Sequence, residues 1–222
     1  MASARASTLP HGGRRFVDLV ALAERRLADA FGGRIARFYG WGIAASYAFA
    51  LLLVKTRAES ILAQALVALS WIPAGLVALG AARDQARIDG ENGFVALVRQ
   101  RGFDTRDLEL ARFFAAAARI FRIVGYPALV LVLVRAALAR SAHDALVSAH
   151  SALGTFVYVL CLSFLLAALA RVSAALSGGR GRTLLVALVL VPHLAQALFP
   201  GVPSVPHALG AILGVFFGEE GG

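Results

Sequence analysis

Long runs of residues without a charged side chain constrain this chain more than any other feature. The uncharged runs cover residues 38–54, 60–82, 145–170 and 183–218. The mean hydropathy of the chain is +0.74, which is far above that of a soluble globular domain. About 20 apolar residues in a helix cross the roughly 30 Å of hydrocarbon in a bilayer. The pattern therefore predicts an all-α fold, a polytopic membrane helix bundle.

Five to six transmembrane helices fit the apolar segments of the chain. The expected spans are residues 38–54, 60–82, 116–138, 147–170 and 183–199, with a shorter sixth segment at 206–217. We expect a tail and an interface helix in residues 1–37, and one transmembrane domain in residues 38–222 with a loop at 83–112. The sixth segment, at about 18 Å of helix, is shorter than the hydrocarbon is thick.

Arginine is distributed unequally among the loops, and this sets the expected orientation. Seven arginines precede the first span and six lie in the 83–112 loop, whereas Arg140 alone follows the third span. Loops rich in Lys and Arg stay on the cytoplasmic side, so we expect the N-terminus and the 83–112 loop in the cytoplasm. The formal net charge of +9 is explained by arginines that face anionic lipid headgroups, and it does not predict nucleic-acid binding.

The stretch before the first span has the pattern of an amphipathic helix. Charged residues occupy the positions between apolar residues that recur at steps of three and four, namely Phe16, Val20, Ala23, Leu27 and Phe31. A helix of this kind lies along the membrane surface with its apolar face in the lipid. We expect Gly32 and Gly33 to end it and to let the chain turn into the bilayer.

The loop between the second and third spans is strongly charged but contains one apolar stretch. Phe94–Val98 is too short to span a membrane, and Gly93 and Gly102 bracket it. Because glycine breaks helices, this arrangement predicts a short helix with a break at each end. Asp104 or Thr105 is then expected to cap a new helix that continues into the third span.

Two arginines lie where this new helix enters the expected span. Arg119 and Arg122 follow Arg112 at spacings of seven and three residues, near one helical face. Ionisable groups near the hydrocarbon are costly and are usually paired or face water. We expect Arg119 and Arg122 to be functional charges at a pathway or an interface, with extension of both side chains into the cytoplasmic interface as the alternative.

The charged loop resembles a motif of the permeases of ABC-2 type transporters, which pair with a separate ATPase. In that family an acidic residue, a spacer and Gly follow the second span, and a short hydrophobic helix, a Pro and a basic residue come next. The corresponding residues of this chain, without a gap, are Glu91, Gly93, Phe94, Val95, Val98, Gly102 and Arg112. Gly102 stands where Pro is usual, and Phe94 and Ala96 stand where the family often has Thr or Ser and Glu.

This resemblance implies that the chain is a transmembrane permease subunit of an ATP-driven transporter in the bacterial inner membrane. Since members of this family are exporters, the resemblance implies export. In that family the short cytoplasmic helix docks on the ATPase, so residues 91–102 and Arg112 would couple the partner ATPase to the spans. A second permease copy or a related subunit would complete the transport pathway.

Other functions have less support in the sequence. The chain lacks a G-x-x-x-x-G-K-[ST] phosphate loop and its only Lys is Lys55, so we expect ATP hydrolysis by a partner, no enzyme activity in this chain and no cofactor. Four histidines are expected near the outer side, but no acidic or thiol side chain is spaced as a ligand set with them, so no metal site is predicted. The remaining alternative is a non-transporting multi-pass subunit that scaffolds or anchors a larger membrane complex.

Glycine recurs at every fourth position of the last apolar segment, at Gly210, Gly214 and Gly218. One face of this helix is therefore bare, and another helix could pack closely there. We expect that face to pack against the bundle or a second subunit. The segment would follow a proline-containing turn on the outer side, so that the chain returns toward the cytoplasm.

Overall fold

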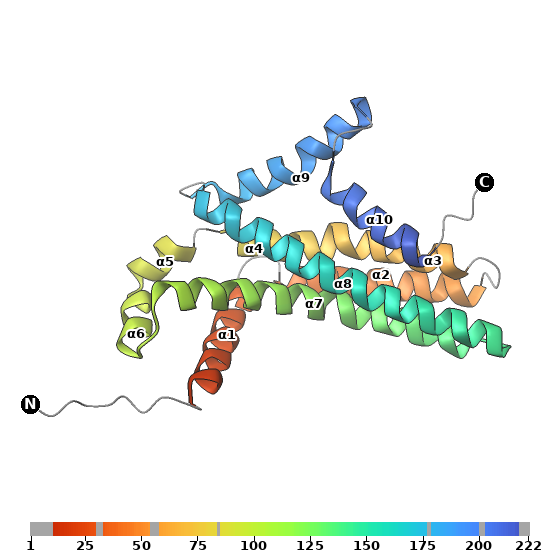
Figure 1. Cartoon of the computed structure of the whole chain (residues 1–222), viewed down its shortest axis with the longest axis horizontal. Helices are drawn as coiled ribbons and strands as arrows, with labels where there is room; N and C mark the ends of the chain where they lie inside the picture. The colour runs from red at the N-terminus through yellow and green to blue at the C-terminus, as the bar shows by residue number, and fades with distance from the viewer. Residues whose placement is uncertain are drawn as a thin grey trace, which may run out of the picture.

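Helices make up nearly all of the chain that the structure describes (Figure 1). This computed structural model describes residues 11–29, 33–53, 58–83, 85–176, 179–199 and 203–217. The helices in chain order are α1 (His11–Asp29), α2 (Gly33–Leu53), α3 (Ala58–Leu69), η1 (Ser70–Ala74), α4 (Gly75–Ala81), α5 (Gln85–Glu91), α6 (Phe94–Gln100), α7 (Thr105–Ala137), α8 (Ala142–Leu176), α9 (Gly181–Leu198) and α10 (Val205–Phe217). These ranges contain no strand, which confirms the all-α class.

Among the described residues, four helical segments have the length and the hydropathy needed to cross a membrane. They are α2, the continuous segment Ser60–Ala81 that runs through α3, η1 and α4, and the long helices α7 and α8. α7 has 33 residues and α8 has 35, so each is about 50 Å long, against roughly 30 Å of hydrocarbon. Both helices therefore extend beyond the hydrocarbon. These four segments agree with the predicted membrane helix bundle.

α7 is the central helix of the bundle and packs against α1, α2 and α8. α2 approaches it closely at Gly40, where an added Cβ would lie 3.2 Å from the carbonyl oxygen of Ile123. The same Cβ would contact the rings of Pro127 and Pro73 at 3.6 and 3.8 Å. Small residues allow helix backbones to approach in a membrane, and Gly40 has this role at the crossing of α2 and α7.

The second span contains a π-helical turn, η1, that the apolar run does not predict. Pro73 lies inside this turn, and since proline has no backbone N–H, the α-helical hydrogen-bond ladder cannot continue unchanged through it. The turn directs Ser70 into the interior. The Ser70 hydroxyl donates to the Leu66 carbonyl oxygen at 2.6 Å and lies 2.6 Å from the Tyr158 hydroxyl of α8, which satisfies both polar side chains.

The last two helices together run from one end of the bundle to the other. We call the end with α5, α6 and the start of α7 the α6 end, and the end where α7 passes into α8 the far end (Figure 1). α9 begins at the α6 end, where an added Cβ on Gly181 would lie 2.2 Å from the carbonyl oxygen of Ala82. α10 ends toward the far end, where Phe216 contacts Gly154 and the ring of His150 on the first half of α8. α9 and α10 together thus pass once along the bundle, from the α6 end toward the far end, with a bend between them.

The course of α9 and α10 differs from the predicted one, in which the last segment turns back toward the cytoplasm. The expected course is a turn on the outer side followed by a return toward the cytoplasm, whereas α10 comes back onto the bundle at an angle to α9 and still advances toward the far end (Figure 1). Both helices are short apolar segments without a basic residue at the turn between them, so the distribution of charge does not specify their orientation. Glu219 and Glu220 lie outside the described residues.

α10 packs by its leucines and not by its glycines. Leu209 and Leu213 are buried, whereas an added Cβ on Gly210 or Gly214 would meet no atom within 4 Å. Packing of the glycine face against the bundle therefore does not occur at these two residues, because the larger apolar side chains of the same helix bury more area. Packing of that face against a second subunit stays a prediction, and Gly218 lies outside the described residues.

The position of α10 depends on Gly154 of α8. A Cβ there would lie 2.6 Å from the Cβ of Phe216, and overpacking of this kind typically costs about 1–3 kcal/mol. We expect Gly154→Val to lower the melting temperature of the detergent-solubilised protein, and Phe216→Gly, which removes the Cβ that would clash, to restore part of the loss when it is added to Gly154→Val.

Gly42→Val is the matched control for this prediction, because a Cβ on Gly42 would meet nothing within 4 Å. The control should melt close to the wild-type temperature. Equal melting temperatures for Gly154→Val and Gly42→Val would show that α10 does not pack on α8 through Phe216.

Candidate functional site

The α6 end is built around a seven-residue helix between two glycines. α6 starts after Gly93, which has a φ of 66°, and the chain leaves it through Gly102, which has a φ of 83°. Residues with a Cβ rarely adopt these values. Asp104 then caps α7: its carboxylate accepts a hydrogen bond from the Asp107 backbone N–H at 2.7 Å, and the Asp107 carboxylate accepts one from the Asp104 N–H at 3.1 Å. The predicted short helix, its glycine breaks and the new helix start are confirmed.

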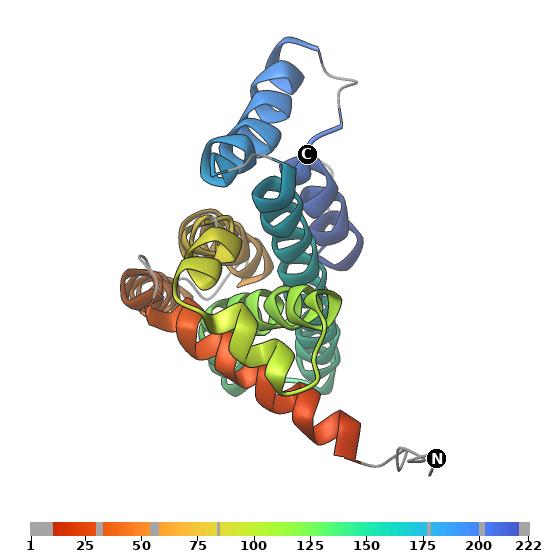
Figure 2. The ribbon, with the colours of Figure 1, turned by 90° about the vertical axis from the view of Figure 1, so that its left-hand side faces the viewer.

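One face of α6 is buried between α1 and α7 (Figure 2). Val98 is 3% exposed and packs with Leu19 of α1 and with Leu108 and Ala111 of α7. Half-buried residues complete this group, which we call the α6 cluster: Phe16, Val20, Phe94, Val95 and Phe103. The α6 cluster is separate from the main core of the bundle, and it fixes α6 to both of its neighbours.

α1 is amphipathic, as its apolar periodicity predicts, and its apolar face packs against other helices of the protein. Leu19 packs in the α6 cluster, and Leu27 packs in the main core. Protein therefore covers the face that was expected to lie in the membrane surface. The pattern alone does not separate the two cases, because lipid and protein core are both apolar surroundings. Gly33, expected to end this helix, is the first residue of α2, and Phe31 and Gly32 lie outside the described residues.

Charged side chains from four helices form a continuous series of ion pairs at the α6 end. Asp89 of α5 accepts hydrogen bonds from Arg26 of α1 at 2.6 Å and from Arg112 of α7. Arg112 also pairs with Glu109 one turn away on α7, and Glu109 pairs with Arg171 of α8. The sign of the charge alternates along these five residues, which we call the ion-pair chain.

Burial makes the pairing in the ion-pair chain obligatory. The side chains of Arg112 and Asp89 are 5% and 9% exposed. Removal of a charge from water costs several kcal/mol unless its partners are in place. Loss of either side chain therefore leaves the other with one partner in place of two, Arg26 for Asp89 and Glu109 for Arg112. Because Arg112 is buried, it does not present its charge to the surface. Any coupling role of Arg112 would act through Asp89 and Glu109.

A cation–π contact connects the ion-pair chain to α6. The guanidinium carbon of Arg26 lies 4.0 Å from the centroid of the Phe94 ring, and contacts of this kind contribute about 0.5–2 kcal/mol. Arg26 therefore touches Asp89 of α5 and Phe94 of α6 at the same time. The α5–α6 unit is held to α1 through this side chain as well as through the α6 cluster.

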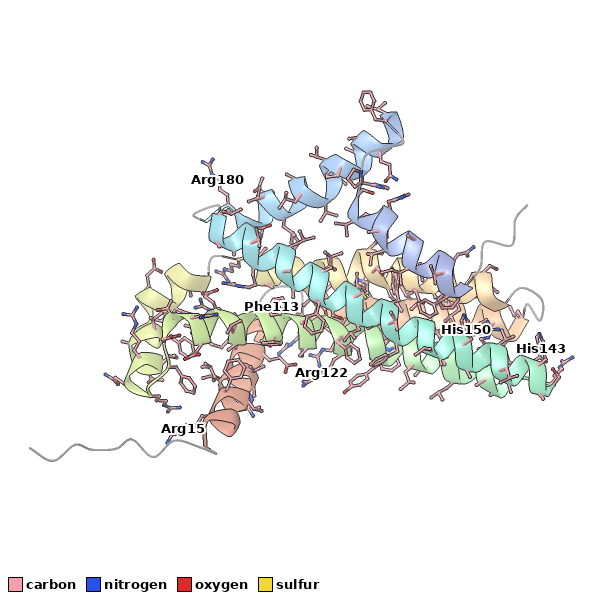
Figure 3. The ribbon with its side chains drawn as sticks, in the orientation of Figure 1. Arg15, Phe113, Arg122, His143, His150 and Arg180 are labelled. Carbon is pink, nitrogen blue, oxygen red and sulfur yellow. The ribbon has the colours of Figure 1, made fainter. Side chains whose placement is uncertain are left out.

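A second ionic contact joins α1 to α7 further along the bundle. Arg122 donates a hydrogen bond to the Glu24 carboxylate at 2.7 Å, and Glu24 is 11% exposed while Arg122 is 52% exposed. Arg122 lies on the side of α7 that faces α1 (Figure 3), and Arg119 is half-buried on the same helix. The expectation that ionisable groups at this depth are paired is confirmed for Arg122.

A groove of about 390 Å³ lies between α1 and α6. We call it the α1–α6 groove, and its volume is within the usual range of ligand pockets. Its lining is apolar at Leu19, Leu22, Leu97, Val98 and Phe103, and polar at Arg15, Asp18 and Arg101. Arg15 marks the end of α1 that extends away from the bundle (Figure 3). The groove therefore combines an apolar floor with charges of both signs.

The coupling residues predicted from the sequence divide into two groups. Val98 and Arg112 are buried, and Phe94 and Val95 are half-buried in the α6 cluster. Glu91, Gly93 and Gly102 are exposed. The exposed residues of α6 are therefore not the predicted apolar ones, and they include Ala96, Leu97 and Gln100.

Sequence reasoning missed four members of the ion-pair chain: Arg26, Asp89, Glu109 and Arg171. The spacing of three residues between Glu109 and Arg112 on one helix could have identified one pair. The other three pairs join residues that are 63, 23 and 62 positions apart. No local pattern connects residues so distant in the chain.

Two of the four histidines expected near the outer side, His150 and His193, lie beside aromatic rings. The ring of His193 lies 5.6 Å from that of Trp71, and the ring of His150 lies 5.6 Å from that of Phe216. Over the described ranges, no group of three or more His, Cys, Asp or Glu side chains is arranged to hold a metal ion.

Comparison with known proteins gives no match to this chain. No model of a protein family, no curated protein and no solved structure matches it. The resemblance to ABC-2 type permeases is not tested by these comparisons and stays a prediction.

The ion-pair chain predicts an unequal effect of single and double substitutions. Asp89→Leu leaves Arg112 buried without this carboxylate, which should cost about 3–5 kcal/mol, whereas removal of both charges of a buried pair is often close to neutral. We expect Asp89→Leu to lower the unfolding midpoint in detergent, and Asp89→Leu with Arg112→Met to recover most of the loss.

Asp18→Leu is the matched control, because it removes an exposed carboxylate of α1 at the same end of the bundle. Its midpoint should stay near the wild-type value. A double variant that is no more stable than Asp89→Leu would contradict the pairing of Asp89 with Arg112.

Proposed function

We propose that the chain is the membrane permease subunit of a transporter driven by a separate ATPase, of the ABC-2 type in its general plan. In this proposal the α6 end and the N-terminus face the cytoplasm of a bacterial cell, and two permease subunits form the pathway. The observation that carries the proposal is α6, a short helix between two glycines with one exposed face and one face tied to the membrane helices.

The chemistry of the α1–α6 groove suits a protein partner. Leu97 offers an apolar side chain at the surface, and Arg15, Asp18 and Arg101 lie around it. Protein interfaces commonly have an apolar centre and a polar rim. A helix or loop of an ATPase with an apolar anchor and charges on each side of it would match this groove.

A displacement of α6 would reach the spans through two sets of contacts. Val98 joins α6 to Leu108 of α7 within the α6 cluster. The ion-pair chain joins α5 to α7 and, through Arg171, to α8. Coupling between two sites requires an element whose arrangement both sites bias. The proposed element is the α5–α6 unit with its hinges at Gly93 and Gly102.

A crosslinking experiment tests the proposed docking site. A photo-reactive amino acid at Leu97, used in native membranes, should capture a polypeptide that is also labelled by 8-azido-ATP, because Leu97 lies in the α1–α6 groove. The same amino acid at Ala145, exposed at the far end of the bundle, is the control and should capture no ATP-binding polypeptide.

Two substitutions in the α1–α6 groove test whether the groove is needed for binding of the ATPase. Leu97→Glu with Arg101→Glu should reduce the amount of co-purified ATPase at least tenfold, since loss of an apolar anchor and a charge commonly weakens binding by more than about 1.4 kcal/mol.

The crosslinking experiment also separates the two candidate functions. Capture at Leu97 of a polypeptide that does not bind ATP would favour the anchoring subunit of a larger complex. Absence of any capture at Leu97 would count against both.

A further inference from the structure

An apolar cavity of about 390 Å³ lies between the second span, α8 and α9, and it shares no lining residue with the α1–α6 groove. η1 and α4 form one wall, Leu166 of α8 lies in another, and Leu185 and Val189 of α9 lie in the third. Trp71 lies at the cavity beside His193 of α9, with ring centroids 5.6 Å apart. α9 diverges from the bundle here (Figure 2), so the space between it and the second span is not filled by side chains.

A smaller cavity of about 90 Å³ continues the first one beneath α10. Both cavities are lined by Ser70, Trp71, Leu166 and Val189. The smaller one reaches Tyr158, whose hydroxyl is hydrogen-bonded to Ser70. The two cavities adjoin each other at these shared residues, and we call them together the α9 groove. None of the residues that line it is charged.

Basic side chains stand where the α9 groove meets the α6 end. Nε of Arg182 donates a hydrogen bond at 3.0 Å to the carbonyl oxygen of Leu79, a residue that lines the groove. Arg180 lies at the connection between α8 and α9 and points away from the ribbon (Figure 3). Both arginines are exposed. A matching occupant is apolar along its length and negatively charged at one end.

We propose that the α9 groove binds an acyl chain of an anionic phospholipid whose headgroup rests on Arg182. The walls offer the chain an apolar surface, and the guanidinium suits a phosphate-containing headgroup. The wide turn of η1 contributes to the opening, and π-helical turns are frequent at functional sites.

This site is independent of an ATPase partner, so it can be tested on the purified chain. Trp41→Phe leaves Trp71 as the single tryptophan of the chain, at the edge of the groove. In nanodiscs of unlabelled phosphatidylcholine, titration with chain-brominated phosphatidylglycerol should quench Trp71 at about fivefold lower lipid content than brominated phosphatidylcholine does, as one arginine at a membrane surface contributes about a factor of five.

Two matched pairs of variants identify the groove as the source of the effect. Arg182→Gln should abolish the preference for phosphatidylglycerol, whereas Arg140→Gln, an equal loss of charge at the far end, should keep it. Val189→Phe fills the groove and should lower quenching by both lipids, whereas Val191→Phe, on an exposed part of α9, should not.

Three results would overturn the proposal: equal quenching by the two lipids in the Trp41→Phe protein, a preference that survives Arg182→Gln, or full quenching in Val189→Phe. Because Arg182 is exposed, its substitution leaves the core intact and gives a decisive result even if Val189→Phe fails to fold.

Discussion

The carboxylate of Asp89, buried between Arg26 and Arg112, is the interaction on which the α6 end depends. A charge in this position is tolerable only with its partners in place. The need for those partners brings α1, α5 and α7 together at one point, and Glu109 extends the same requirement to Arg171 of α8. The short helix α6 could not hold a fixed orientation by its own seven residues. It is oriented because the helices around it are joined by paired charges.

α8 contributes residues to both the ion-pair chain and the α9 groove. Arg171 is the last member of the ion-pair chain, and Leu166, little more than one turn away, lines the α9 groove. A shift of α8 that begins at the ion-pair chain would therefore alter the width of the groove. Lipid in the groove and a partner at α6 would then influence each other, and such coupling is reciprocal by thermodynamic necessity.

The sequence predicts the features that depend on neighbouring residues. The uncharged runs predict the long apolar helices, and Gly93 and Gly102 predict the ends of α6, because hydropathy and backbone freedom are local properties. The ion-pair chain and the direction of α10 depend on contacts between distant residues, such as Asp89 with Arg26 and Phe216 with Gly154. The inward orientation of Val98 likewise depends on α1 and α7, which the spacing within the loop does not place.

Hydrogen exchange of the intact chain in nanodiscs tests most directly whether the ion-pair chain holds the α6 end together. The Asp89→Asn variant keeps the shape of the side chain but removes its charge, so Arg26 and Arg112 both lose their ion pair with Asp89, while Arg112 keeps its pair with Glu109. We expect faster exchange in α1 and α6 together, with α9 unchanged, because Arg26 of α1, which touches Phe94 of α6, is then no longer held by Asp89. Unchanged exchange in α1 and α6, or an equal increase in all helices, would contradict this expectation.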